Sequence, residues 1–111
     1  MEKSGDKEKI RHILTDPRLS GIKALLEKDH AIDCIFLLYM ERGKWKPAKE
    51  FMNKNELTLS DGTFRSRMIE ITELGMAKPV PIDPLKKYYV MTDFGEKVAE
   101  LLLEFFDKLD L

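Results

Sequence analysis

The sequence predicts one mainly helical domain with a small β-hairpin before its last helix. Apolar residues recur at helical spacing over most of the 111 residues. The period changes only at residues 76–91, where two prolines and an aromatic, β-branched run are typical of an edge strand and its partner. Helical spacing then returns with a wide apolar stripe that continues to the end of the chain. The length suits a single domain with its own core.

Local signals place six helices along the chain. They span residues 6–15, 19–28, 31–42, 47–54, 60–74 and 93–111. Pro17 ends the first helix. The third is apolar on almost every side, as in a central helix covered by others, with Asp29 as its expected N-cap and Gly43 as its C′ residue. A short extended segment, residues 44–46, precedes the fourth helix, and Pro47 takes that helix's first position.

The fifth helix has the clearest pattern. Ser60 is its expected N-cap, the apolar ridge consists of Phe64, Met68 and Ile71 at i, i+4 and i+7, and Gly75 ends it. With that ridge buried, steps of about 100° per residue leave the opposite side to solvent. The residues expected on that side are Gly62, Ser66, Ile69 and Glu73, flanked by Thr63 and Arg65.

A hairpin follows the fifth helix. Its strands are expected at residues 76–82 and 88–91, with Lys86 and Lys87 near the tip of the turn, and Thr92 caps the last helix.

Two segments resemble a known family. Residues 60–76, Ser-Asp-Gly-Thr-Phe-Arg-Ser-Arg-Met-Ile-Glu-Ile-Thr-Glu-Leu-Gly-Met, are similar to the recognition helix of MarR- and HxlR-type regulators of bacteria and archaea. Residues 84–95 are similar to their wing, which closes with Tyr-x-Leu-Thr-x-x-Gly, here with Met91 in place of Leu. With these two segments and this order of helices and strands, the chain resembles a winged helix-turn-helix regulator over about residues 25–103. The Leu-Leu-Glu-Lys sequence of residues 25–28 favours the HxlR variant.

This resemblance implies binding of double-stranded DNA. Recognition helices enter the major groove by their first turns, where small and hydrogen-bonding residues gather here. Arg65 can donate two hydrogen bonds to a guanine, Thr63 or Ser66 can bond a base edge or a phosphate, and Arg67 makes a phosphate contact or an internal salt bridge. The expected DNA-contacting residues are Ser60, Gly62, Thr63, Arg65, Ser66, Arg67, Lys44, Lys46, Lys49, Lys86 and Lys87.

The chain has a net charge of −1, but its charged residues are distributed unevenly along the sequence. Residues 44–89 carry nine basic and six acidic side chains, whereas residues 90–111 carry two basic and six acidic ones. A polyanion should therefore meet the middle of the chain. The alternatives are an ordinary solvated helix face and lysines that keep an edge hairpin soluble.

The last helix carries more apolar residues than one small domain has to cover, and this favours a homodimer. The expected interface residues are Phe94, Val98, Leu101, Leu102, Phe105, Phe106 and Leu109. The alternative is that these residues close the core of a single subunit. The expected division is therefore an N-terminal helical extension (1–28), a winged-helix core (31–92) and a dimerisation helix (93–111).

No enzyme, metal or cofactor is expected. His12 and His30 lack partners at metal-ligand spacing, and no phosphate-binding loop or nucleophile motif occurs. Cys34, the single cysteine, is expected to be an inert core group, with redox sensing as the alternative. No signal peptide or membrane span is recognisable, so a cytoplasmic protein is expected. The rival function is a winged-helix module that binds another protein and no nucleic acid.

Overall fold

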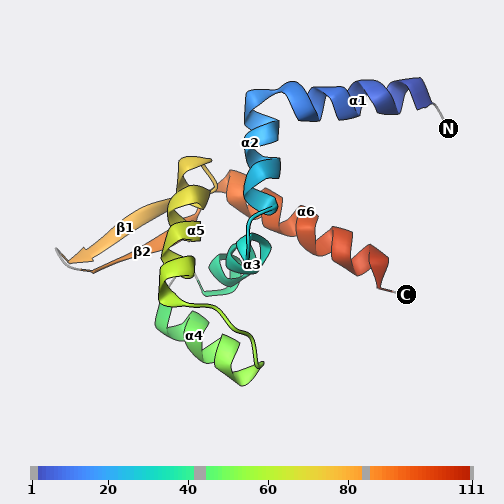
Figure 1. Ribbon diagram of the computed structural model, residues 1–111. Helices are drawn as coiled ribbons and strands as arrows, with labels where there is room; N and C mark the ends of the chain where they lie inside the picture. Colours follow the sequence, from blue (N-terminus) through green and yellow to red (C-terminus); the bar gives the residue numbers. More distant parts are fainter. Residues whose placement is uncertain (1–2, 42–44, 84–85, 111) are drawn as a thin grey trace.

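The computed structural model describes residues 3–41, 45–83 and 86–110, with side chains for residues 5–41, 48–81 and 88–110. The described part contains six helices and one two-stranded antiparallel sheet (Figure 1). In chain order they are α1 (Lys3–Thr15), α2 (Pro17–Leu26), α3 (Ala31–Glu41), α4 (Trp45–Lys54), α5 (Asp61–Glu73), β1 (Ala77–Asp83), β2 (Lys86–Met91) and α6 (Asp93–Leu109). The prediction of a mainly helical domain with a small hairpin is confirmed.

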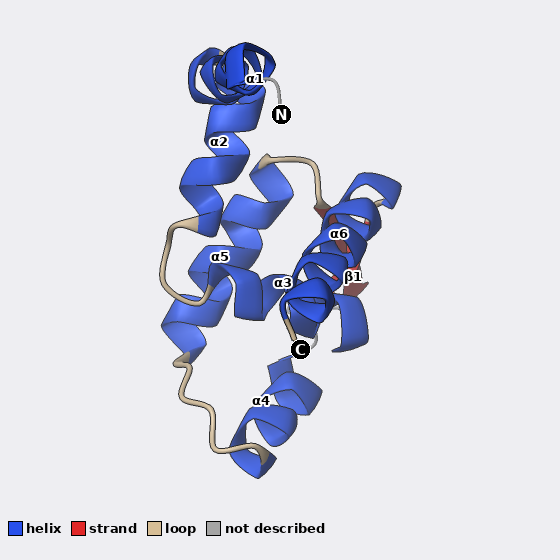
Figure 2. Ribbon diagram, turned by 90° about the vertical axis from the view of Figure 1, so that its right-hand side faces the viewer, coloured by secondary structure: helices blue, strands red, loops and turns tan. Residues whose placement is uncertain are grey.

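Helix α3 lies at the centre, with α2, α4, α5 and α6 around it (Figures 1 and 2). Its side chains at Cys34, Ile35 and Leu38 are buried, as expected for a helix that is apolar on most sides. The other buried core residues include Leu25 of α2, Met52 of α4, three residues of α5 and Ala99 of α6. The core therefore lies on one side of α5 and leaves the other side of that helix free.

Helix α2 begins two residues before the predicted start. The Asp16 carboxylate accepts hydrogen bonds from the backbone N–H groups of Arg18 (2.9 Å) and Leu19 (3.0 Å), and Pro17 takes the first helical position. Pro17 thus ends α1 and begins α2, because a proline at this position lacks only an N–H that would have no helical partner. Figure 1 shows α1 turning away from the body at this point.

Two predictions of helix boundaries around α3 and α4 are wrong, and a third falls outside the described residues. Asp29 is not in the capping position, because His30 directly precedes α3 and has a left-handed backbone (φ 61°). Trp45 is helical, so the expected extended segment is wrong there, and Pro47 is the third residue of α4. The first-turn N–H groups of a helix have no internal acceptor, so Pro47 is tolerated at any of these positions. Gly43 lies outside the described residues.

Helix α5 ends in a Schellman motif. Gly75 has φ 79°, its N–H donates to the carbonyl of Thr72 (2.9 Å), and the N–H of Met76 donates to the carbonyl of Ile71 (3.1 Å). The left-handed conformation explains why glycine stands here. The motif turns the chain directly into β1.

Hydrogen bonds of Thr92 hold the start of α6 against this turn. Thr92 caps α6 by accepting from the N–H of Gly95 (3.0 Å), while its hydroxyl donates to the carbonyl of Gly75 (2.6 Å) and its N–H to the carbonyl of Met76 (3.0 Å). A Cβ on Gly95 would lie 1.9 Å from the Met76 carbonyl oxygen, so only glycine allows this approach. One cluster of hydrogen bonds therefore fixes α5, the base of the hairpin and α6 together.

The hairpin runs in register from the Ala77–Met91 pair to the Asp83–Lys86 pair, with an irregularity between Pro81 and Asp83. It is the whole sheet in the described part of the chain, which suits a strand with two prolines. No helix in the described residues is long and apolar enough to cross a membrane.

Candidate nucleic-acid interface

The N-terminal cap of α5 orients this helix on the core. Ser60 has an extended backbone (φ −82°, ψ 157°), and its Oγ accepts from the N–H of Thr63 at 3.1 Å. Phe64, Met68 and Ile71 are buried. The predicted cap and apolar ridge are both confirmed, and they fix which face of α5 points outward.

The outward face of α5 begins with small residues. Gly62, Arg65, Ser66 and Ile69 are exposed, and Thr63 is half-buried. A Cβ added to Gly62 would have the Ser60 hydroxyl, 4.0 Å away, as its nearest neighbour among the described residues outside the backbone of its own helix turn. Packing inside the chain therefore does not require glycine here, although glycine lowers helix stability relative to alanine.

The hydroxyl groups of this turn differ in what they can still bind. The Ser60 hydroxyl donates to Thr63 Oγ1 (3.0 Å) in addition to its role as cap, so its proton is already used. Thr63 keeps its own hydroxyl proton, and Ser66 is exposed one turn further along. Ser60 is thus a capping residue, while Thr63 and Ser66 remain able to donate to a partner.

The two arginines of α5 lie in different environments. Arg67 is 17% exposed at its side chain, and its Nε donates to the backbone carbonyl of Asp29 (2.8 Å) while its Nη1 pairs with Glu70. Lys28 pairs with the other Glu70 oxygen and is the main cause of the lowered pKa of this carboxyl group. Burial opposes the shift, and Arg67 lowers the pKa further. Of the two predicted roles for Arg67, the internal salt bridge is the one observed.

Arg65 is the opposite case. It is exposed, and within the described part of the chain it makes no ion pair. Its guanidinium group is therefore available to an external acceptor.

The predicted lysines are only partly described. Lys49 is exposed on α4, whereas Lys44 lies outside the described residues. The backbone places Lys46 in α4 and both Lys86 and Lys87 in β2, the first two residues of that strand and not part of the turn, and the side chains of all three lie outside the description. Lys78, which does not belong to the predicted DNA-contacting residues, is exposed on β1.

The hairpin and α5 share one side of the molecule. Figure 1 shows the hairpin projecting away from the body beside α5, while α1 and the C-terminal end of α6 extend to the opposite side. Figure 2, viewed from that opposite side, has α6 in front of β1. α5 and the hairpin thus lie on one side of the molecule, whereas the C-terminal end of the acidic α6 lies on the other.

The predicted dimer residues divide into two groups. Phe94, Val98 and Leu102 pack against the core of their own subunit. The others remain exposed on the middle and the C-terminal half of α6: Leu101 (54%), Phe105 (56%), Phe106 (45%) and Leu109 (61%). Among these, Leu101, Phe105 and Leu109 follow one another at intervals of four and form one stripe, which we call the distal α6 stripe.

Cys34 is fully buried in α3. The pKa of its thiol is raised to about 12, mainly by burial and also by the charge of the nearby Asp33, against a lowering effect of Arg67. The reactive thiolate is therefore scarce at neutral pH, which disfavours redox sensing by this residue. No group of three or more metal-ligating side chains occurs among the described residues.

Comparisons of the chain with protein families, with curated proteins and with solved structures find no match.

Proposed function

We propose that the protein is a homodimeric DNA-binding transcription regulator with a winged helix-turn-helix fold. In this proposal α3, α4 and α5 form the helical part, β1 and β2 form the wing, and α5 is the recognition helix. The order of elements and the resemblance of residues 60–76 and 84–95 to prokaryotic MarR- and HxlR-type regulators support this assignment.

The observation that carries the proposal is the open first turn of α5. Gly62 leaves space that the fold does not need, Thr63 and Ser66 offer hydroxyl donors, and Arg65 offers a free guanidinium group. A recognition helix meets base edges with these N-terminal positions, and arginine donates two hydrogen bonds to guanine O6 and N7. Close approach and hydrogen-bond donors are the two properties that such a turn requires.

Phosphate contacts would come from α4 and the hairpin. Lys44, Lys46 and Lys49 lie at or near the first turns of α4, and Lys86 and Lys87 begin β2. Such contacts set the register and affinity of a complex without reading sequence. With three to five of them per subunit, log K should fall with log salt by about 0.9 for each phosphate neutralised.

The dimer would form on the opposite side of the molecule. The distal α6 stripe is exposed, and α1 carries a second exposed apolar stripe at Ile10, Ile13 and Leu14. By formal charge α1 sums to +2 and α6 to −3, so the two helices are electrostatically complementary. Pairing α1 of one subunit with α6 of its partner would cover both stripes. A two-fold axis would then place the recognition helices about 34 Å apart.

The direct test is selection of bound duplexes from a random library with the purified protein, followed by fluorescence anisotropy at several salt concentrations. Arg65→Ala should weaken the selected duplex by about 1–3 kcal/mol and relax its sequence preference, whereas Lys86→Ala should weaken all duplexes alike. Lys23→Ala removes a positive charge from an exposed position of α2, which is assigned neither to DNA contact nor to the dimer, and should leave the sequence preference unchanged.

Two results would contradict the proposal. If Arg65→Ala binds every duplex as the parent protein does, α5 does not read bases. If no salt-sensitive binding occurs even at low salt, the protein is instead an interaction module that docks another protein on the exposed end of α6.

A further inference from the structure

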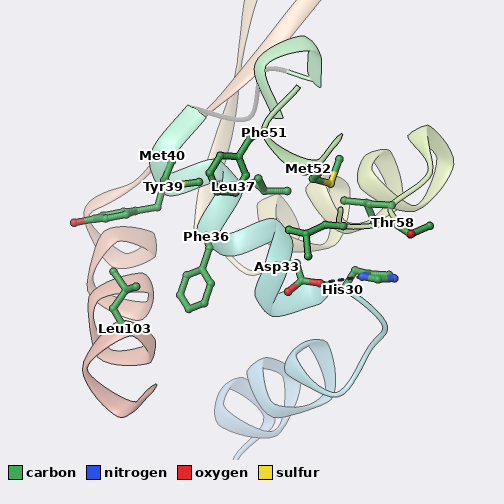
Figure 3. Close-up of a pocket in the computed structure, with 12 residues that line it drawn as sticks. His30, Asp33, Phe36, Leu37, Tyr39, Met40, Phe51, Met52, Thr58 and Leu103 are labelled. Atoms are coloured by element: carbon green, nitrogen blue, oxygen red, sulfur yellow. Dashed lines mark hydrogen bonds and ion pairs between the residues drawn. The ribbon is translucent and has the colours of Figure 1, made fainter. Parts of the chain in front are cut away.

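A cavity of about 440 Å³ lies on a different face from the candidate DNA interface, between α3, α4, the loop of residues 55–60 and α6 (Figure 3). Its lining is almost entirely apolar. The side chains that define it are Phe36, Leu37, Phe51, Met52, Leu59 and Leu103. The volume falls in the range of sites that hold small molecules.

Several large side chains around the cavity remain exposed. Tyr39, Met40, Phe51 and Leu57 come from three segments of the chain, yet all four line this one space. By contrast, Leu37 and Met52, which also line the cavity, are buried in the core. The exposed four therefore add little to the fold, and apolar atoms that face an open space lack dispersion partners that an apolar ligand would supply.

One end of the cavity is polar. His30, Asp33 and Thr58 lie together there, away from Leu103 (Figure 3). His30 Nδ1 lies 2.9 Å from a carboxylate oxygen of Asp33. An ionised carboxylate can only accept, so the imidazole donates from Nδ1. Asp33 has a second oxygen and a negative charge. This end thus favours a ligand group that donates hydrogen bonds and carries positive charge.

We propose that the cavity binds an organic amine, with its aromatic or aliphatic body against the apolar walls and its ammonium group at Asp33 and His30. His30 and Asp33 are both exposed, so the ammonium group stays partly hydrated and no charge has to be buried. Carboxylates and phosphates of the same shape would be repelled by Asp33. The site does not depend on whether α5 binds DNA.

The test uses the 111-residue chain and three probes that share one ring system: 2-naphthylmethylamine, 2-naphthylmethanol and 2-naphthoate, titrated by isothermal calorimetry and ligand-observed NMR. The amine should bind most tightly and the carboxylate about tenfold or more weaker, since ionic attraction is replaced by repulsion. Asp33→Asn should bring the affinity of the amine down to that of the alcohol.

A second pair of variants tests the apolar wall. Leu57→Lys should lower the affinity of the amine at least about tenfold, because a cation replaces part of the wall. Ile69→Lys makes the same change at a similarly exposed residue of α5 outside the cavity and should leave the affinity unchanged. Thermal unfolding of both variants checks that the fold is intact.

Four results would overturn the proposal. They are the absence of saturable amine binding at millimolar concentration, equal binding of the amine and the carboxylate, full amine binding by Leu57→Lys, and conversion of a dimer to monomers by Leu57→Lys. The last result would make the cavity an interface between two copies of the chain.

Discussion

Replacing Gly62 with leucine should make the protein more stable and a poorer binder of DNA. The position lies in the first turn of α5, and a Cβ there has open space around it. Leucine is a good helix former, so the substitution removes the conformational entropy cost of glycine, at an exposed position where the Cβ meets no steric conflict. A larger side chain would, however, project from the turn that we assign to the major groove.

The expected gain in unfolding free energy is about 0.5–1 kcal/mol. With an unfolding entropy of about 2.1 cal/mol/K per residue, the 111 residues give about 230 cal/mol/K, so Tm should rise by about 2–4 °C. If the turn approaches base edges, the loss in DNA affinity should be at least about tenfold, or about 1.4 kcal/mol. Stability and binding should thus change in opposite directions.

Differential scanning fluorimetry measures the first effect, and anisotropy with the selected duplex measures the second. Gly21→Ala is the matched control, because it also replaces a helical glycine and its Cβ would meet Leu74 Cδ2 at an ordinary 3.5 Å. It should raise Tm and leave DNA binding unchanged. If Gly62→Leu raises Tm and binds the duplex as tightly as the parent protein, the first turn of α5 does not face DNA.

Three further predictions concern the packing of α6 on the hairpin base, the ion pairs of Glu70 and the distal α6 stripe. Gly95→Ala should destabilise the protein by about 3 kcal/mol or more in urea denaturation, since its Cβ would collide with the Met76 carbonyl; an unchanged midpoint would contradict the close approach of α6. Glu70→Gln should lower stability most at neutral pH. The folded state lowers the pKa of Glu70, so the stability that its carboxylate contributes is present above the ordinary value of 4.5 and lost as pH falls through the lowered value. The difference between the two proteins should therefore shrink towards about pH 3, and a constant difference would show that ionisation of Glu70 is irrelevant. Phe105→Glu should shift a dimer towards monomers in sedimentation velocity with unchanged helical circular dichroism, whereas Ile69→Glu, an exposed apolar residue on α5, should not.

The features that the sequence predicted well are local ones. The cap at Ser60 and the ridge of Phe64, Met68 and Ile71 depend on residues within three turns of one helix. The hairpin depends on prolines that restrict β1 and on the aromatic run that follows in β2. Short-range hydrogen bonding and side-chain periodicity determine these features, so an isolated segment already contains the information.

The features that the sequence left open depend on distant partners. The sequence allows Arg67 either a phosphate contact or an internal salt bridge. Only the fold, which brings Asp29 and the Lys28–Glu70 pair beside Arg67, decides between them. The apolar pattern of α6 does not tell which of its residues cover the core. Phe94, Val98 and Leu102 pack against the body of the subunit, whereas Leu101, Phe105 and Leu109 form a separate row that the body leaves exposed. The sequence does not indicate the cavity, because its walls come from distant segments. Phe51, for example, belongs to the apolar stripe of α4 that also contains the buried core residues Ala48 and Met52.

The arrangement of the two exposed features constrains what the protein can bind. The open turn of α5 and the distal α6 stripe lie on opposite sides of the body, so one compact partner cannot cover both (Figure 1). They also differ in chemistry, because the first offers hydrogen-bond donors and a free guanidinium group while the second is apolar and lies on an acidic helix. An acidic helix would repel a polyanion, and a turn of small polar residues would give an apolar partner little area to bury. A polyanion at α5 and a second copy of the chain at α6 satisfy both conditions. The two interactions can be tested separately. Arg65→Ala should weaken DNA binding without changing the association of two copies, and Phe105→Glu should weaken that association without changing the surface that α5 offers to DNA.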